Sequence, residues 1–273
     1  MLGQDLQKAL AGRQVTALNR TELDVTDLEA VRSAVRGHDV VINASAYTKV
    51  DDAETNEDAA YAVNATGAAN LATASAENAA TMVQVSTDYV FDGSARSPYS
   101  ESTPVNPVST YGRTKAEGER LAATLNPGRT HIVRTAWLYG QHGPNFAKTM
   151  IRLASQRDTI NVVTDQVGQP TWTLDLAKQI VILLDSGAPA GIYHGTNAGQ
   201  ASWFDFTRAI FTHVGLDAAR VAPTDSSHFV RPAPRPAYSV LSHHAWLVAG
   251  IAPMRPWDEA LAEAAREGVL EQE

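Results

Sequence analysis

The sequence predicts the α/β fold class, with a doubly wound parallel sheet followed by a smaller C-terminal region. Three compact runs, 39–43, 81–86 and 131–135, are rich in β-branched residues and are typical of buried parallel strands. Helical patterns separate them, and strands that alternate with helices form βαβ units with helices on both faces of one sheet. The alternation loosens after about residue 159. We therefore expect a first domain over 1–158 and a second region over 159–273.

Composition excludes several classes of protein. The chain has 273 residues, 22 of them basic and 30 acidic, and carries no cysteine. A net charge of −8 argues against a nucleic-acid partner. The lack of cysteine excludes disulfides, thiolate zinc sites and catalytic thiols. The longest apolar runs, such as 179–184, are too short for a bilayer, and no basic-then-apolar leader opens the chain. We expect a soluble, cytoplasmic protein without a membrane partner.

Two helices and two strands are expected before residue 45. Leu2, Leu6 and Leu10 recur every four residues, which predicts a helix that ends near Gly12. Residues 14–18 form a short strand-like run. Aspartate and threonine side chains over 24–27 are suited to cap the helix that the apolar residues at 28, 31 and 35 predict. The run 39–43 then follows as a strand.

The rest of the chain continues the pattern and then relaxes it. From the apolar periodicity we expect the following elements: a helix over 58–78, a strand over 81–86, a helix over 110–125, a strand over 131–135, a helix over 145–156, a strand over 159–163, a helix over 173–185, a strand around Ile192 and helices over 202–214 and 257–267. The proline-rich stretch 229–238 is expected to be an extended loop.

The spacing of Tyr111 and Lys115 points to proton-transfer chemistry. Four residues make about one helical turn, so the phenol and the ammonium lie on the same face. An ammonium beside a phenol favours the phenolate and lowers its pKa from about 10. Such a phenol can protonate a carbonyl oxygen that is being reduced. An exposed helix pair without function is the alternative, so this motif needs support from its surroundings.

The support comes from the end of a strand. The run 81–86 leads into Ser86-Thr87-Asp88-Tyr89-Val90-Phe91-Asp92-Gly93, and open α/β sheets bind ligands at the carboxyl ends of their strands. The hydroxyl of Thr87 can hydrogen-bond the same carbonyl oxygen that Tyr111 protonates. The alternative is a Ser/Thr turn that only caps the strand.

Together with Asn-Phe-Ala-Lys-Thr-Met at 145–150, these motifs resemble the extended short-chain dehydrogenase/reductase superfamily. Within it they resemble the dTDP-4-dehydrorhamnose reductases, to which the segments 41–54, 165–171 and 235–241 are also similar. The resemblance spans essentially the whole chain. It implies a Rossmann-like NAD(P)-binding domain over 1–158 and a mainly substrate-binding region over 159–273.

The same resemblance implies roles for individual residues. The catalytic residues would be Thr87, Tyr111 and Lys115. Besides Tyr111 and Lys115, the cofactor-binding residues would be Gly3, Arg20, Asp24, Val25, Ala44, Ala46, Tyr47, Thr48 and Asn64. The substrate-binding residues would be Thr87, Asp88, Trp137, Asn145, Phe146 and Arg235.

Three of these residues have plain alternatives. Arg235 suits a diphosphate because its planar fork pairs oxygens bidentately, but it can equally form a surface ion pair. Trp137 follows a strand and can present a flat face to a sugar ring or belong to the core. Asn64 supports the active site in the family, and its alternative is ordinary helix surface.

The cofactor is expected to be NADPH. An acidic residue at the end of the second strand binds the ribose 2′-hydroxyl, whereas arginine accommodates a 2′-phosphate. Here the strand-like run 14–18 is followed by Asn19 and Arg20, with no carboxylate. NADH stays open, because the family accepts either. An acidic run over 51–58 could attract Mg²⁺, but a solvated helix surface is the better interpretation, so we assign no metal ligands. His243 and His244 are expected at the surface.

The start of the chain departs from the dinucleotide-binding pattern. Gly3 resembles the third glycine of the fingerprint, but the first strand and the first two glycines are missing. Without that strand, strand edges would be exposed. We expect that the natural chain begins about ten residues upstream.

The implied reaction is the NAD(P)H-dependent reduction of the C4 ketone of dTDP-4-dehydro-L-rhamnose to dTDP-L-rhamnose, a donor for surface polysaccharide. Two alternatives stay open. One is a nucleotide-sugar epimerase or dehydratase of the same superfamily, which keeps its NAD bound. The other is a non-catalytic binding relative, similar to the regulatory subunit of methionine adenosyltransferase. The partner would be a nucleotide sugar, and a homodimer is left open.

Overall fold

The computed structural model describes residues 1–271, and its main feature is a four-stranded parallel sheet. Neighbouring strands in the order β1-β2-β3-β8 run parallel throughout. They are β1 (Val40–Asn43), β2 (Thr81–Thr87), β3 (Thr130–Thr135) and β8 (Gly191–His194). The predicted α/β class with a parallel sheet is confirmed.

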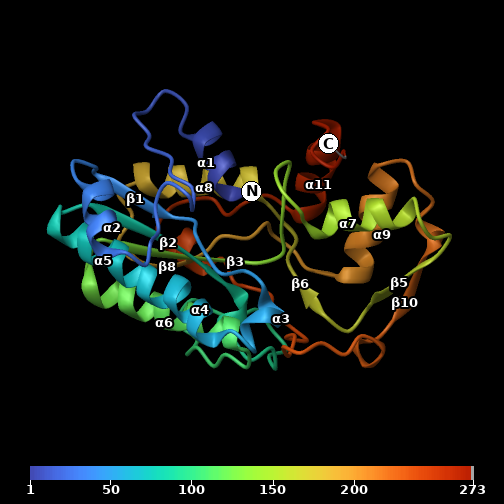
Figure 1. Cartoon of the computed structure of the whole chain (residues 1–273). Helices are drawn as coiled ribbons and strands as arrows, with labels where there is room; N and C mark the ends of the chain where they lie inside the picture. The colour runs from blue at the N-terminus through green and yellow to red at the C-terminus, as the bar shows by residue number, and fades with distance from the viewer. Residues whose placement is uncertain (272–273) are drawn as a thin grey trace.

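Helices cover both faces of this sheet (Figure 1). On one face lie α1 (Leu2–Ala9) and α8 (Thr173–Asp185). On the other lie α2 (Leu28–Val35), α4 (Glu57–Tyr61), α5 (Gly67–Glu77) and α6 (Thr110–Leu125), with the short α3 (Val50–Ala53) near the strand ends. Alternation along β2 divides the core, because Val83 packs with α1 and α8 whereas Met82 packs with α2 and α5.

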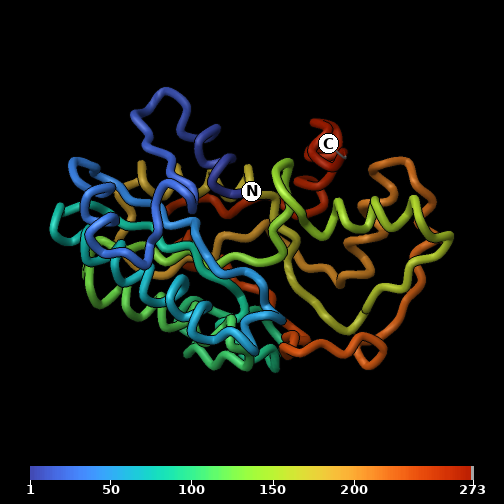
Figure 2. Tube along the Cα trace, viewed as in Figure 1, coloured from blue at the N-terminus to red at the C-terminus, as the bar shows by residue number. Residues whose placement is uncertain are grey.

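A second group of elements lies beside the sheet, on the right in Figure 2. Its helices are α7 (Phe146–Ala154), α9 (Trp203–His213) and α11 (Trp257–Arg266). Its paired strands are β5 (Ile160–Val163) with β10 (Val221–Thr224), β4 (Leu138–Tyr139) with β7 (Thr171–Trp172), and β6 (Val167–Gly168) with β9 (Ala201–Ser202). A separate apolar core, which includes Phe206, Ile210 and Leu261, holds this group together.

The chain passes between the two groups more than once. Both α8 and β8 come after residue 159, yet they pack with the main sheet. The short helix α10 (His244–Val248) also packs beside β8, through Trp246, whose indole N–H donates to the carbonyl of His194. The boundary that we place at residue 158 stays a prediction.

The strand predicted over 14–18 is wrong. These residues are exposed and pair with no strand among the described residues. A strand needs a neighbour to satisfy its backbone groups, and within residues 1–271 no strand pairs with the outer edge of β1. The same position at the edge leaves Val40 38% exposed, although we expect the run 39–43 to be buried.

Other differences are local. The helix predicted over 58–78 contains a π-helical turn at Ala62–Thr66, between α4 and α5. His243, expected at the surface, is half-buried, and its Nε2 lies 2.8 Å from the hydroxyl oxygen of Thr196. Burial lowers the pKa of His243 to about 4. Its sequence neighbours could not show this, because Thr196 comes from the segment after β8. His244 is exposed as predicted.

Among residues 1–271, no helix combines the length and apolar character needed to cross a lipid bilayer.

Candidate active site

The predicted catalytic residues meet at the carboxyl end of β2. Thr87 ends this strand and pairs with Thr135 at the end of β3. Tyr111 lies in the first turn of α6, and Thr87 is near enough to its phenol to lower the pKa of that phenol. The structure therefore brings the threonine hydroxyl and the phenol to one point, at the edge where parallel sheets bind their ligands.

The start of α6 is held in place from two sides. The Ser109 side chain caps the helix by accepting the backbone N–H of Gly112 at 3.1 Å. Gly112 itself permits close packing, since a Cβ there would lie 2.2 Å from the carbonyl oxygen of Tyr89. Glu54 accepts the backbone N–H and the hydroxyl of Thr110 at 2.8 and 3.0 Å. Sequence reasoning missed the roles of Glu54 and Gly112, although the glycine directly after Tyr111 is a visible signal.

Lys115 points into the sheet. Its Nζ donates to the carbonyl oxygen of Val85 at 2.6 Å, and the side chain is buried. Burial lowers the pKa of this ammonium to about 8, and the carboxylate of Glu119 opposes that effect. The group is therefore mostly charged at neutral pH.

The predicted lowering of the Tyr111 pKa is wrong. Burial of the phenol, which disfavours the phenolate, raises the pKa of Tyr111 to about 12, while the hydrogen bond with Thr87 lowers it and the charge of Asp88 raises it. Lys115 does not offset this, because its ammonium donates to the backbone of β2. Tyr111 is thus a neutral phenol that can give up a proton.

Asp88 is a buried carboxyl that can still accept a hydrogen bond. Its Oδ1 accepts the hydroxyl of Thr87 at 3.0 Å, while its Oδ2 is buried without a partner among the described residues. Burial raises the pKa of Asp88 to about 6, and hydrogen bonds from Ser239 and Thr87 oppose the rise. An acceptor without a partner at this edge is suited to a ligand hydroxyl.

Asn64 lies buried in the π-helical turn, which excludes the helix-surface alternative. Its Oδ1 accepts the backbone N–H of Tyr47 at 2.8 Å, and its Nδ2 donates to the Thr114 hydroxyl at 3.0 Å. Gly118 allows α6 to approach, since a Cβ there would lie 2.1 Å from the Asn64 carbonyl oxygen. Asn64 therefore ties α6 to the loop after β1.

Three of the residues predicted to bind the cofactor, Arg20, Asp24 and Tyr47, lie close enough for the charge of Arg20 to act on the other two. Asp24 accepts the backbone N–H and hydroxyl of Thr26, at 2.9 and 2.8 Å. These bonds lower the pKa of Asp24, and the charge of Arg20 adds to the effect. The hydroxyl of Tyr47 bonds to the carboxylate of Asp52, which raises the tyrosine pKa while Arg20 opposes the rise. Arg20 itself is exposed.

The other residues predicted to bind the cofactor differ in exposure and in packing. Ala44 and Thr48 are exposed and Ala46 is half-buried, all in the loop after β1. Val25 packs on Gly67. A Cβ built on Gly67 would lie 2.6 Å from Cγ2 of Val25. Gly3 is exposed in α1, and no atom of the described residues lies within 4 Å of a Cβ built there, so it makes no close backbone approach in this structure.

Arg235 reaches the site through an ion pair. Its Nη2 lies 2.9 Å from Oδ1 of Asp51, and its guanidinium carbon lies 6.0 Å from the ring centre of Tyr89. Tyr89 in turn packs edge-to-face with Tyr111, with ring centres 5.6 Å apart. The ion-pair alternative is therefore realised, but beside the catalytic edge.

Asn145 and Phe146 act mainly in the second group of elements. The Asn145 side chain caps α7 by accepting the backbone N–H of Lys148 at 3.1 Å and donates to the carbonyl of Gly140 at 2.9 Å. Phe146 packs against Trp203, with ring centres 4.3 Å apart, and Trp137 stacks on the same indole. A role for Asn145 and Phe146 at the nucleotide stays a prediction.

The acidic run 51–58 makes more contacts within the protein than expected. Asp51, Asp52 and Glu54 bond to Arg235, Tyr47 and Thr110, so these carboxylates are not simply solvated. Within residues 1–271 no group of three or more histidine or acidic side chains is arranged to hold a metal ion.

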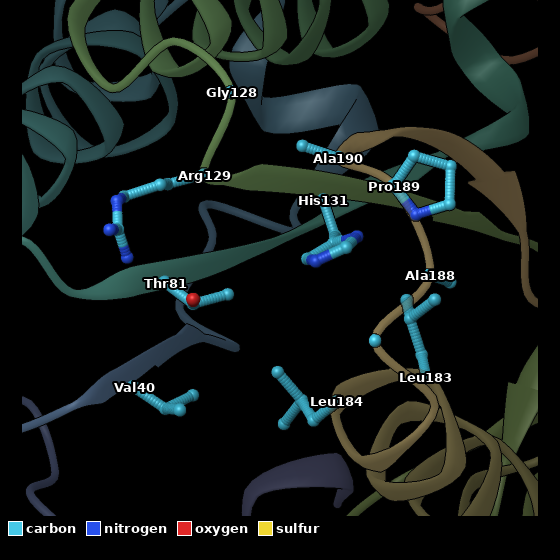
Figure 3. Close-up of a pocket in the computed structure, with 11 residues that line it drawn as sticks. Val40, Thr81, Gly128, Arg129, His131, Leu183, Leu184, Ala188, Pro189 and Ala190 are labelled. Atoms are coloured by element: carbon cyan, nitrogen blue, oxygen red, sulfur yellow. The ribbon is translucent and has the colours of Figure 1, made fainter.

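Two cavities are lined by other residues than the predicted catalytic ones. One of about 430 Å³ opens at the amino ends of the strands, between Val40, Thr81, His131 and Leu183 (Figure 3). The other, of about 400 Å³, is lined by residues that include Gln169. Neither is lined by Thr87, Tyr111 or Lys115, so the candidate site is the carboxyl edge itself.

Known proteins resemble the chain over nearly its full length. Residues 1–269 match the family described as RmlD substrate binding domain. A dTDP-4-dehydrorhamnose reductase of Streptomyces griseus is 49% identical over 97% of this chain and 90% of its own. A dTDP-4-keto-6-deoxy-D-glucose reductase of Streptomyces niveus is 47% identical over 97% and 93%. The crystal structure of a dTDP-4-dehydrorhamnose reductase from Bacillus anthracis in complex with NADP is 38% identical, with a TM-score of 0.93 over 97% and 95%. The chain therefore belongs to the RmlD substrate binding domain family.

Proposed function

We propose that this chain is an NADPH-dependent oxidoreductase that reduces the C4 ketone of dTDP-4-dehydro-L-rhamnose to dTDP-L-rhamnose. The observation that carries the proposal is that Thr87 and Tyr111 lie together at the carboxyl end of β2, near enough for Thr87 to lower the pKa of the phenol, with Lys115 one turn further along α6. Its relatives in Streptomyces griseus and Streptomyces niveus are named as reductases of dTDP-linked 4-keto sugars and differ in the sugar.

The donor set fits a nicotinamide dinucleotide with a 2′-phosphate. Arg20 carries an exposed guanidinium that donates no hydrogen bond within residues 1–271, beside the loop that follows β1. A bound NADPH supplies the hydride. Arg20 would hold the 2′-phosphate, and the loop 44–48 and Lys115 would hold the ribose and phosphates.

Side chains of this protein then donate the proton and polarise the carbonyl. Tyr111 gives its phenolic proton to the oxygen that becomes the hydroxyl, since its high pKa keeps it neutral beforehand. Thr87 hydrogen-bonds the same oxygen and polarises the carbonyl. Asp88 accepts a hydroxyl of the sugar.

Consumption of NADPH separates this proposal from its alternatives. Incubation with dTDP-4-dehydro-L-rhamnose should consume NADPH in step with the appearance of dTDP-L-rhamnose, followed by absorbance and chromatography. An epimerase or dehydratase would convert the sugar without net consumption of NADPH. A binding protein would leave both compounds unchanged. Either result would contradict the proposal.

Arg20 is expected to set the choice between NADPH and NADH. Arg20→Ala removes the partner of the 2′-phosphate, so the KM for NADPH should rise about tenfold, as for a lost charged hydrogen bond. The KM for NADH should stay within about twofold. Steady-state kinetics with both cofactors provide the check, with Arg13→Ala as the matched control, because Arg13 is paired with Asp185 on the α8 side. A uniform rise for both cofactors would refute the role of Arg20.

A homodimer and a cytoplasmic location belong to the same proposal and rest on the family resemblance. Sedimentation of the purified protein and fractionation of the cells that make it would test them.

A further inference from the structure

Trp137 has a backbone conformation that bulky residues rarely adopt. It lies between β3 and β4 with φ of +47°, in the left-handed region. Such a conformation costs free energy and persists only where the surroundings hold it. The indole is stacked on Trp203 at the start of α9, with ring centres 3.5 Å apart and planes within 8°. One face of Trp137 is therefore covered by another indole.

Gly168 covers the opposite face. A Cβ built on Gly168 would lie 2.5 Å from Cε2 of Trp137 and 2.7 Å from both Nε1 and Cζ2. Cε2 is bonded to those two atoms, so an approach that is closest to Cε2 comes from above the ring and not along its edge. Because Trp203 already occupies one side, Gly168 lies on the other. The three residues form a sandwich with Trp137 in the middle.

This indole sandwich borders the catalytic edge. Trp137 follows Thr135, which pairs with Thr87. On the other side of the sandwich, Val167 precedes Gly168 and accepts the backbone N–H of Ser239 at 2.9 Å. Ser239 in turn lies near enough to Asp88 to lower the pKa of its carboxyl. The sandwich therefore lies next to the buried carboxyl that we expect to bind the sugar.

The indole sandwich changes which part of Trp137 can contact a sugar ring. The expectation of an open flat face is wrong, since Trp203 and Gly168 cover both faces. What remains is the edge of the indole, including Nε1–H, which donates no hydrogen bond within the described part of the chain. We propose that Trp203 and Gly168 are positioning residues that clamp Trp137 so that the edge of its indole, with the Nε1–H donor, contacts the sugar ring of the substrate. This inference rests on the proposed function.

Kinetics of clamp variants test the inference. Trp203→Leu removes the stacking partner, so the KM for the sugar nucleotide should rise by about twofold to tenfold, the range of one aromatic pair. Gly168→Ala forces the indole to move and should raise the same KM at least as much. Trp203→Phe retains an aromatic ring and should restore most of the affinity. The KM for NADPH should stay unchanged in all three variants, because the clamp does not face the cofactor loop.

Phe204→Leu is the matched control, because Phe204 is the next residue of α9, contacts Arg208 and has no stacking contact with Trp137. It should leave the KM for the sugar nucleotide unchanged. A wild-type KM in Trp203→Leu and in Gly168→Ala would overturn the inference.

A spectroscopic measurement tests the sandwich without any substrate. Stacked indoles share near-UV circular dichroism, so Trp203→Leu and Trp137→Phe should remove the same band, whereas Phe204→Leu should retain it. Unrelated difference spectra would overturn the clamp even if the enzyme is active. Absence of turnover by the wild-type protein would instead refute the proposed function, so the two failures are distinguishable.

Discussion

At the residue scale, burial decides the charge states in the candidate active site. Thr87, Tyr111 and Asp88 lie together where β2 ends, and burial raises the pKa of both Tyr111 and Asp88. The phenol stays protonated at neutral pH, which suits a proton donor. The carboxyl is mostly ionised at neutral pH but costs stability, because its Oδ2 has no partner among the described residues.

Asp88 should make the free energy of unfolding depend on pH. Its pKa is about 6 in the folded chain against an ordinary value of 3.8, so folding favours the protonated form. That stabilisation is complete below pH 3.8 and is lost as the pH rises through 6. At ~1.4 kcal/mol per pKa unit, the loss amounts to about 3 kcal/mol. Asp88→Asn stays neutral, so its stability relative to wild type should rise by that amount between pH 4 and 7.

Urea denaturation of both proteins across this pH range provides the check. Asp92→Asn is the matched control, because hydrogen bonds from Ser94 and Tyr99 lower the pKa of Asp92 to about 2. Asp92→Asn removes a carboxylate whose pKa is lowered by folding, so this variant should be destabilised more at high pH than at low pH. If the free energies of unfolding of Asp88→Asn and of wild type change with pH in parallel, the pKa of Asp88 is not raised in the folded chain.

The sequence indicates the candidate catalytic residues more readily than their charge states. The spacing from Tyr111 to Lys115 and the strand end at Thr87 are visible in the chain. The direction of the Tyr111 pKa was not predictable from spacing, because it depends on burial and on the bond that Lys115 makes with Val85.

At the scale of elements, α6 carries Tyr111 and Lys115 of the candidate active site and is anchored by a buried ion pair. Arg134 of β3 forms two hydrogen bonds with the carboxylate of Glu119, at 2.9 and 2.7 Å, with side-chain exposures of 2% and 6%. Glu119 lies one turn beyond Lys115 on the same helix. The pair therefore sets the position of the helix that carries Tyr111 and Lys115.

Glu119→Gln should destabilise the chain by about 3–5 kcal/mol, because it leaves the Arg134 guanidinium buried without a counter-charge. Glu117→Gln is the matched control on the same helix. Its partner Arg120 is 61% exposed, so the cost should be below about 1 kcal/mol. Thermal and urea unfolding of both variants measure the difference, and equal effects would contradict the assignment of α6 to this anchor.

Sequence reasoning predicted the helix over 110–125, which the structure confirms as α6 and which Ser109 caps. It missed the π-helical turn around Asn64, because the alanines of that helix carry no signal for it. It also predicted a strand over 14–18, which pairs with nothing in the described chain. Periodicity cannot report whether a strand finds a neighbour.

At the scale of the whole molecule, the site forms where the second group of elements crosses the edge of the main sheet. The segment 233–241 supplies Arg235, which pairs with Asp51, and Ser239, which lies near Asp88 and lowers its pKa. Trp137 and Gly168 border the same place. The substrate-binding role of the C-terminal part of the chain stays a prediction.

The parallel sheet and its order of elements could be predicted, because strands and helices alternate regularly up to about residue 158. The return of α8 and β8 to that sheet could not, because it depends on packing of Leu176 and Ile180 against α1 and β2. The sandwich of Trp137 was equally hidden, since its partners lie at positions 168 and 203.

The most direct test of the account is NADPH oxidation with dTDP-4-dehydro-L-rhamnose by wild type, Tyr111→Phe and Tyr193→Phe. Tyr193 is the control, because its hydroxyl only bonds to the carbonyl of Pro189, away from the catalytic edge. We predict that Tyr193→Phe keeps its activity and that Tyr111→Phe loses about 10²- to 10⁴-fold in kcat, the contribution of one positioned proton donor. Turnover by Tyr111→Phe at the wild-type rate would contradict the account.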